Sequence, residues 1–474
     1  MILLFRFYPW IARVWGVAFA LAAMGSDASH TRLARGPWSG DITPTTAEVR
    51  AKLDQDGREV RLWVSRDSDL TRPAIYGPAV SQTNIAGNVV GFHLTYLRPD
   101  TTYYFAFEVK GEVERIKAGR FHTFPARPAS FTFAFASCGI TGSTNASYDC
   151  IRRHEPLFFL CTGDFHYEDI DTNRVEKFQH AYDKVLASPV QAQLYREVPL
   201  IYMWDDHDFC GNNSDDRARG RIAVKQAYRD YFPHYPLLDE SPAGPITQSF
   251  EVGRVKFLMT DLRSQRERAL TRDGPGKSML GALQKNWLKR ELRAANGVYP
   301  LIFWISSVPW SGNSHTNYYW PVTTNDFGYL HHQNLSYIPT TNARPTRPVA
   351  VDSWAAYAHE RREIADFVKA NQIRGLVILQ GDMHALAADD GSNSDFATHG
   401  GAPIPVMAAA PLDRDASIKG GPYSQGVYKP RKHEGCFGLV EVMDLGSTIT
   451  ARFSGRNHED EEKITLSVSV PAQF

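Results

Sequence analysis

Four short segments of the sequence place acidic, imidazole, phenol and thiol side chains directly after apolar stretches. They are Ser137-Cys138, Gly163 to Tyr167 (GDFHY), Trp204 to Asp208 (WDDHD) and Gly381 to His384 (GDMH). Such donors suit iron, manganese or calcium better than a closed structural zinc site. Each segment alone is more often a turn or a helix cap. Together they predict a metal site, because three neighbouring carboxylates after a buried stretch would be costly without cations nearby.

A pair of cations at these segments would support hydrolysis of a phosphate ester. Two cations about 3.5–4 Å apart neutralise the ester's charge and lower the pKa of bound water, and His207 would protonate the leaving oxygen. Arg263 is a candidate contact to the phosphate, or an ion pair that braces its loop. Asn212 and Asn213 are further candidates for phosphate contacts, or form a turn. The sequence contains no GxSxG elbow, and the reaction needs no serine nucleophile.

The elements that must position these residues are buried strands alternating with helices. Near-continuous apolar runs are typical of strands buried on both faces. The predicted strands cover 131–138, 156–164, 198–208, 254–263, 300–310 and 374–384, and the predicted helices cover 172–188, 216–232, 282–295 and 354–371. The sequence returns to strands in its last third. We therefore expect residues 128–474 to form an α/β domain with two facing sheets and functional groups at the strand ends.

The preceding segment, residues 29–127, has a different pattern of short alternating strands and polar turns. The predicted strands cover 45–53, 59–65, 88–97, 101–111 and 118–125, with no helix signal. This pattern predicts a β-sandwich domain. The stretch from Leu94 to Pro125 also resembles the end of a fibronectin type III domain, and Pro125–Pro128 is interpreted as a linker.

The N-terminal sequence and the overall charge indicate where the protein is located and what it can bind. Residues 1–28 are predicted to be a signal peptide, because Arg6 and Arg13 precede a short apolar run and small residues follow. The run is shorter than the roughly 20 residues of a membrane span, so a secreted, periplasmic or cell-surface protein is favoured over an anchored one. The 52 basic and 52 acidic residues balance, which argues against a nucleic-acid-binding surface. We expect a monomer.

The order of the motifs resembles that of a known family. FASC, GDFHY, WDDHDF with NNSD, TDLRSQR, LGALQKNWL, SSVPW, WAAYAHERREI and GDMHA follow one another between Phe131 and Ala385. This series is similar to that of the PhoD-type alkaline phosphatases, within the calcineurin-like metallophosphoesterases. The resemblance implies an αββα catalytic sandwich behind a fibronectin- or Ig-like first domain. The segment from Ser311 to Ala350 is too long for a plain connection and is interpreted as a wall or lid of the site.

The resemblance also implies a set of metal ligands. Asp164 would bridge two ions, and Cys138 and Tyr167 would bind a ferric ion. The remaining implied ligands are Asp206, Asp382 and His384. The implied cofactors are Fe³⁺ and Ca²⁺, with Mn²⁺ or another divalent ion as an alternative.

Further roles concern the WDDHD segment. The resemblance implies that His207 donates a proton beside the scissile bond. Asp208 would orient His207, or would be an outward-facing cap. The motif leaves a one-residue ambiguity between Asp205 and Asp206 as the ligand.

The predicted function is an exported, metal-dependent phosphoesterase of the alkaline phosphatase type that hydrolyses phosphate monoesters, diesters or both. One alternative is a phospholipase D-like phosphodiesterase on the same scaffold, which a deep apolar groove beside the metals would favour. Another is a non-catalytic surface protein that uses its sandwich for binding, which a site empty of metal would favour.

Overall fold

The protein is described by a computed structural model that covers residues 32–472, apart from 270, 313–318, 321–346 and 349–351. The described residues belong to one compact unit. The predicted signal peptide (1–28) and most of the segment interpreted as a wall or lid lie outside them. Among the helices of this part of the chain, none combines the length and apolarity that a membrane crossing requires. The division into domains at residues 127 and 128 stays a prediction.

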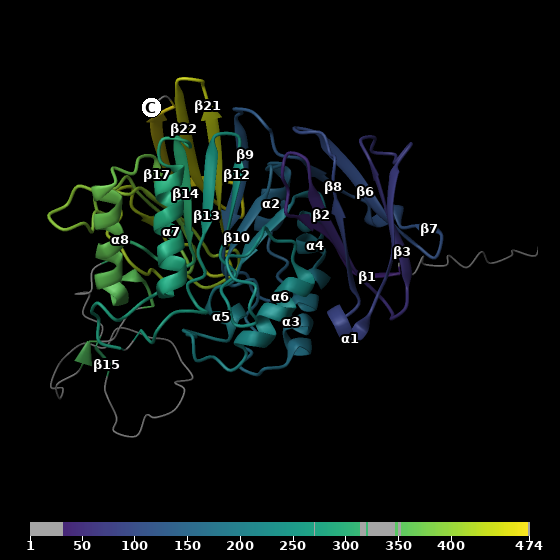
Figure 1. Ribbon diagram of the computed structural model, residues 1–474, viewed down its shortest axis with the longest axis horizontal. Helices are drawn as coiled ribbons and strands as arrows, with labels where there is room; N and C mark the ends of the chain where they lie inside the picture. The colour runs from purple at the N-terminus through teal and green to yellow at the C-terminus, as the bar shows by residue number, and fades with distance from the viewer. Residues whose placement is uncertain (1–31, 270, 313–318, 321–346, 349–351, 473–474) are drawn as a thin grey trace, which may run out of the picture. The chain divides into compact units, whose positions relative to one another are not determined.

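The first strands form two facing antiparallel sheets (Figure 1). One sheet contains β1 (Leu33–Gly40), β2 (Ala47–Leu53) and β5 (Val89–Leu94). The other contains β3 (Glu59–Ser65), β4 (Ala74–Val80), β6 (Thr102–Val109), β7 (Glu112–Val113) and β8 (Gly119–His122). Alternate residues of β2 are buried, as expected for a strand with one face in a core. The predicted β-sandwich is confirmed, with β1, β4, the one-turn helix α1 (Thr83–Ala86) and a 3₁₀ turn (Arg115–Lys117) as additions.

The rest of the chain is built on two further sheets. The six-stranded sheet has the order β11 (Leu200–Met203), β10 (Phe159–Thr162), β9 (Phe131–Ala136), β21 (Cys436–Asp444), β22 (Thr448–Asn457) and β23 (Glu462–Pro471). The seven-stranded sheet has the order β12 (Gln248–Val252), β13 (Val255–Met259), β14 (Leu301–Ser306), β17 (Leu376–Gln380), β19 (Val406–Ala409), β18 (Leu386–Asp389) and β20 (Val427–Tyr428). Strands β9, β10 and β11 are parallel, as are β13, β14, β17 and β19. A two-residue pairing joins β15 (Tyr319–Trp320) to β16 (Arg347–Pro348).

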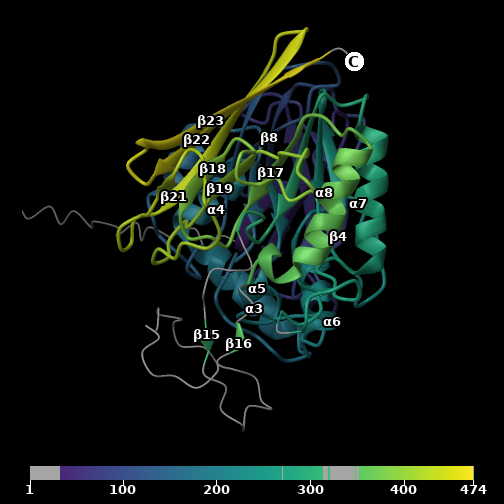
Figure 2. The same ribbon diagram turned by 90° about the vertical axis from the view of Figure 1, so that its left-hand side faces the viewer.

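Helices cover the outer faces of the two sheets (Figures 1 and 2). The seven-stranded sheet packs against α7 (Gly281–Ala295) and α8 (Ala358–Ala370), which follows a 3₁₀ turn at Trp354–Tyr357. The helices on the side of the six-stranded sheet are α2 (Ser147–Arg153), α3 (Val175–Ala187), α4 (Pro189–Glu197) and α6 (Arg221–Tyr231). The facing sheets meet through aromatic pairs such as Phe133 with Phe257 and Phe303, at centroid distances of 5.4 Å. This αββα arrangement confirms the predicted fold class.

The N-terminal sandwich rests on the six-stranded sheet and its helices. The indole Nε1 of Trp38, a fully buried side chain of β1, donates to the Tyr231 carbonyl of α6 at 2.8 Å. Lys52 of β2 pairs with Asp183 of α3 at 2.5 Å. These contacts tie the first strands to the helices that lie beneath the carboxyl ends of β10 and β11.

Candidate metal centre

The predicted site residues lie where buried parallel strands end. Cys138 follows β9, Asp164 follows β10, and Asp206 begins α5 (Asp206–Phe209) shortly after β11. Asp382 and His384 follow β17 of the facing sheet. Figures 1 and 2 show α5 at the same end of both sheets. The carboxyl ends of the strands therefore bring residues that are far apart in the sequence to one edge.

Four of these residues have a left-handed backbone. The φ angles of Cys138, Asp164, Asp382 and His384 are 62°, 53°, 57° and 47°. Residues other than glycine rarely adopt this region, and such outliers gather at functional sites, where the surrounding structure imposes them. Here Cys138 N donates to the Gly163 carbonyl at 3.2 Å, and Asp382 N donates to Ser137 Oγ at 3.2 Å. The strand ends thus fix one another's backbone.

The donor atoms of the site form three overlapping groups, each within 4.8 Å. The groups are Cys138 with Asp164 and His384, Asp164 with Asp206 and His207, and Asp164 with Asp205, Asp206 and Asp382. Asp164 belongs to all three groups. An arrangement in which one carboxylate is shared by neighbouring donor sets can hold two cations side by side, with that carboxylate between them.

Tyr167 joins the group of Cys138 and His384. Its hydroxyl donates to Asp164 Oδ2 at 2.7 Å and lies 3.3 Å from His384 Nε2. Burial, followed by the Asp164 charge, raises the pKa values of Tyr167 and Cys138 well above their ordinary values. Both groups are therefore protonated in the metal-free protein, and a bound cation is what would deprotonate them.

Two carboxylate oxygens at the centre have no hydrogen-bond partner. Asp205 Oδ2 and Asp382 Oδ2 are buried and unpartnered among the described residues. Burial raises the pKa of each carboxyl to about 7, with Arg263 opposing the shift at Asp205 and Lys419 at Asp382. Although burial acts in the same direction on Asp206, Arg263 and His207 hold the pKa of Asp206 below its usual range. Orphaned buried oxygens beside an ionised carboxylate fit a site for hard cations.

Asp205 and Asp206 share the third donor group but differ in their contacts. Asp205 Oδ1 accepts from Arg263 Nε and from Ser307 Oγ, both at 2.6 Å. Asp206 accepts from the Asn213 backbone N at 2.7 Å and from its own neighbour, His207 N, at 2.9 Å. Asp206 also belongs to two of the three groups, whereas Asp205 belongs to one. The geometry favours Asp206 as the ligand and leaves Asp205 beside it.

His207 is held by a carboxylate that the sequence did not single out. Its Nδ1 lies 2.6 Å from Asp169 Oδ1. Although burial opposes the shift, Asp206 and Asp164 raise the pKa of His207 to about 10. The partner predicted for this ring, Asp208, is turned away: its oxygens accept from Asp205 N at 2.6 Å, and from Phe165 N and Tyr202 OH at 2.8 and 2.7 Å.

Asp208 is therefore a fully buried helix cap. The prediction that Asp208 orients His207 is corrected, and the outward-facing alternative does not describe it either.

The three candidate phosphate contacts lie in different environments. Arg263 is fully buried, with Nη1 2.9 Å from Asp352 Oδ2 in addition to its bond to Asp205. It thus forms the ion pair named as the alternative. Asn213 supports Asp206 through its backbone and accepts a bond from Arg266 at 3.2 Å through its carbonyl. Asn212 is exposed in the same turn.

Lys419 and Arg414 are site residues that sequence reasoning missed. Lys419 Nζ forms an ion pair with Asp382. The Arg414 guanidinium lies over the Tyr167 ring at 4.1 Å from its centroid. Both residues come from an irregular segment after β19, and no pattern in the sequence marks them.

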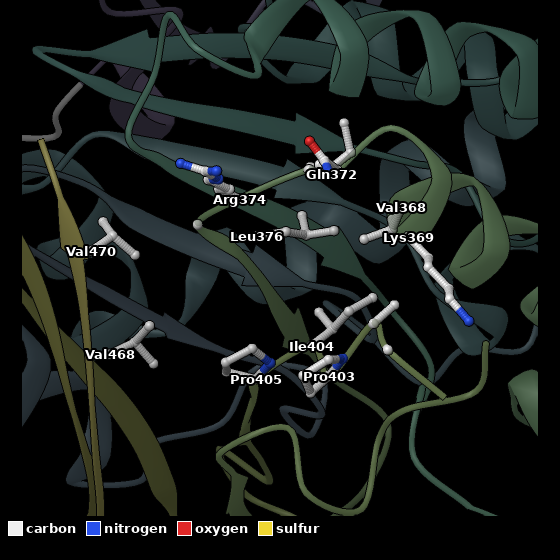
Figure 3. A pocket seen from close by; sticks show the side chains of 14 residues that line it. Val368, Lys369, Gln372, Arg374, Leu376, Pro403, Ile404, Pro405, Val468 and Val470 are labelled. Carbon is white, nitrogen blue, oxygen red and sulfur yellow. The ribbon is translucent and has the colours of Figure 1, made fainter. Parts of the chain in front are cut away.

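A cavity of about 590 Å³ lies at the opposite end of the sheet from these residues (Figure 3). Its lining includes Leu376, the first residue of β17, Pro403 to Pro405 directly before β19, and Val468 and Val470 of β23. Because Asp382 and His384 follow the end of β17 whereas the cavity lies at its beginning, the cavity is separate from the candidate metal centre.

The fold and the site define a protein of the metallophosphoesterase type. A family model described as PhoD-like phosphatase matches residues 133–416. The chain belongs to the PhoD-like phosphatase family. The predicted family is confirmed, and the family's name agrees with the predicted class of activity, hydrolysis of phosphoric esters.

Two known proteins extend this comparison. The chain is 24% identical over 426 residues to alkaline phosphatase D of Bacillus subtilis (strain 168), an alignment that covers 80% of this chain and 65% of that protein. The chain thus spans somewhat less than two thirds of that relative. A solved structure titled "Structure of PhoD" superposes with a TM-score of 0.70 at 19% identity, covering 94% of this chain and 91% of the other. At that identity the superposition supports the fold alone.

Proposed function

We propose that the protein hydrolyses phosphate monoesters and diesters at a centre of two cations. The observation that carries this proposal is the membership of Asp164 in all three donor groups. A single structural ion would need one closed donor set, whereas overlapping sets with unpartnered oxygens leave coordination positions for substrate. Membership of a phosphatase family supports the same reaction.

The donors divide by chemistry between two ions. Cys138, Tyr167 and His384, together with Asp164, would hold Fe³⁺, because thiolate and phenolate suit a ferric ion better than calcium. Asp206 and Asp382, together with the shared Asp164, would hold Ca²⁺ or another divalent ion such as Mn²⁺. When bound, such a pair supplies charge neutralisation and an activated water.

The chain's own residues contribute the proton and its orientation. The contact of Asp169 with Nδ1 orients the ring of His207 and stabilises its charged form, in which Nε2 also carries a proton that can pass to the leaving oxygen. Asp169, which is not among the proposed ligands, contributes to raising the pKa of His207 and so favours the charged ring that a general acid requires.

The alternative of a phospholipase D-like diesterase needs a deep apolar groove beside the metals. The cavity of Figure 3 opens at the other end of the strands and does not serve this purpose. We also propose that residues 1–28 direct export and that the protein is a monomer; both proposals rest on the sequence alone.

The test combines elemental analysis with hydrolysis of chromogenic phosphate esters. Wild-type protein is expected to contain iron and a divalent metal, and Asp164→Asn to lose both metal and at least about a hundredfold in kcat/KM, because it removes the shared ligand. Asp69→Asn, an exposed carboxylate of the sandwich, is the matched control and should change neither. Undiminished metal and activity in Asp164→Asn would refute the bridging role, and wild-type protein without metal or hydrolysis would favour the binding-protein alternative.

A further inference from the structure

The segment between β19 and β20, residues 410–426, lies directly against the candidate metal centre. Its backbone bonds twice to the turn that bears Cys138: Leu412 N donates to the Ser137 carbonyl at 2.9 Å, and Asp413 N to the Cys138 carbonyl at 3.2 Å. It also holds His384, whose Nδ1 lies 2.8 Å from the Asp415 carbonyl. We call residues 412–421 the cation loop, because it presents Arg414 and Lys419 to the site.

Each cation of this loop stands beside a different donor group. Lys419 Nζ pairs with Asp382 Oδ1, and Asp382 belongs to the donor group made of four aspartates. The other oxygen, Asp382 Oδ2, is buried and unpartnered. Arg414 stacks on the Tyr167 ring. The hydroxyl of Tyr167 contacts Asp164 and His384, which belong to the donor group that contains Cys138. The loop therefore flanks both proposed ion positions with fixed positive charge.

Arg414 lacks a counter-ion. Among the residues that the structure describes, no carboxylate pairs with its guanidinium, and its Nε is buried without a hydrogen-bond partner. Only 27% of the Lys419 side chain is exposed to solvent. A guanidinium with unused donors, held in place over an aromatic ring, is suited to bind a phosphate oxyanion.

We propose that Arg414 and Lys419 bind the non-bridging oxygens of the substrate phosphate and select terminal phosphate monoesters over diesters. This inference rests on the proposed function and names its preferred substrate class. A monoester presents a dianion with three terminal oxygens, so two further cations attract it more strongly than the monoanion of a diester. The second ester linkage of a diester would also replace one of the terminal oxygens to which Arg414 and Lys419 bind.

The test compares p-nitrophenyl phosphate with bis(p-nitrophenyl) phosphate as substrates of Arg414→Gln, Lys419→Gln and the exposed control Lys429→Gln. Each loop variant is expected to lose at least about tenfold in kcat/KM for the monoester, ~1.4 kcal/mol of transition-state binding. The diester value should fall by less than about threefold, and the inhibition constant of inorganic phosphate should rise by about tenfold. Iron and divalent metal content and the unfolding midpoint should match the wild type, and the control should match in every respect.

An equal fall for both substrates, or an unchanged inhibition constant for phosphate, would overturn the inference. If Lys419→Gln does not fold, Arg414→Gln decides, since Arg414 has no ion pair among the described residues whose loss would unfold the chain. Wild-type protein that hydrolyses neither ester would instead refute the proposed function itself.

Discussion

Substitution of Arg263 by methionine separates a bracing role from a substrate-binding role. Arg263 is fully buried and makes close ion pairs with two carboxylates, Asp205 at 2.6 Å and Asp352 at 2.9 Å, with Asp206 farther away at 3.9 Å. Methionine preserves much of the side-chain volume and removes the charge. Both carboxylates would then lose a buried cation, although Asp352 keeps its contact with Arg266.

The expected loss of stability is about 3–5 kcal/mol, the usual consequence of removing one partner of a buried ion pair and leaving the other uncompensated. The double variant Arg263→Met/Asp205→Asn should be less destabilised than the sum of the two single variants, because the second change removes the charge that the first left unpaired. The coupling between the two positions is expected to be about 1–3 kcal/mol.

Urea unfolding followed by tryptophan fluorescence measures these differences, with the exposed Arg272→Met as the control. A shifted urea midpoint with an unchanged m-value would report stability itself. The bracing role is refuted if Arg263→Met unfolds within about 0.5 kcal/mol of wild type while its KM for a phosphate ester rises about tenfold, which is the result expected of a direct phosphate contact.

Two further predictions concern single carboxylates. Asp169→Asn should retain its metal but lose about tenfold in kcat. The alkaline limb of its pH–rate profile should move to lower pH, because Asp169 helps to raise the pKa of His207. An unmoved limb would contradict the assignment of Asp169 as the partner of His207. Burial raises the pKa of Asp41 from 3.8 to about 7, so the folded protein holds this proton more tightly than the unfolded chain does. Wild type should therefore lose stability relative to Asp41→Asn as the pH rises from about 4 to about 7, by at most ~4 kcal/mol, with a constant difference at higher pH. Parallel urea midpoints for the two proteins across this range would contradict the shift.

The metal donors could be predicted because strand geometry alone brings them together. Cys138, Asp164 and Asp206 follow three adjacent parallel strands, and Asp382 follows a strand of the facing sheet. Apolar runs reveal such strands, and the first polar residues after them must share one edge. Sequence reasoning therefore placed these side chains at one edge without knowledge of the loops.

Residues whose contacts depend on loop paths could not be predicted in this way. Asp208 follows His207 directly, yet successive side chains of a helical turn point about 100° apart, and Asp208 turns back to cap its own helix. The residue that contacts His207 is Asp169, 38 positions away in an irregular segment. Arg414 and Lys419 are further examples, since nothing periodic fixes where residues 410–426 run.

The strands missed in the sandwich have a similar explanation. β4 is mostly exposed, with a glycine and a proline at Gly77 and Pro78, and it lies at the edge of its sheet. β1 contains Gly36 and Pro37 and departs from regular register at this point. Neither has the strict alternation from which a half-buried strand is recognised.

The position of β9 has a consequence for biosynthesis. This strand, which leads to Cys138, lies between β10 and β21, and β21 begins only at Cys436. A nascent chain that ends before this residue already contains every metal donor, yet one side of β9 still exposes unpaired amides and carbonyls. Assembly of the central sheet thus waits for the last strands to be made, and cation uptake should be a late step that follows slow, long-range pairing.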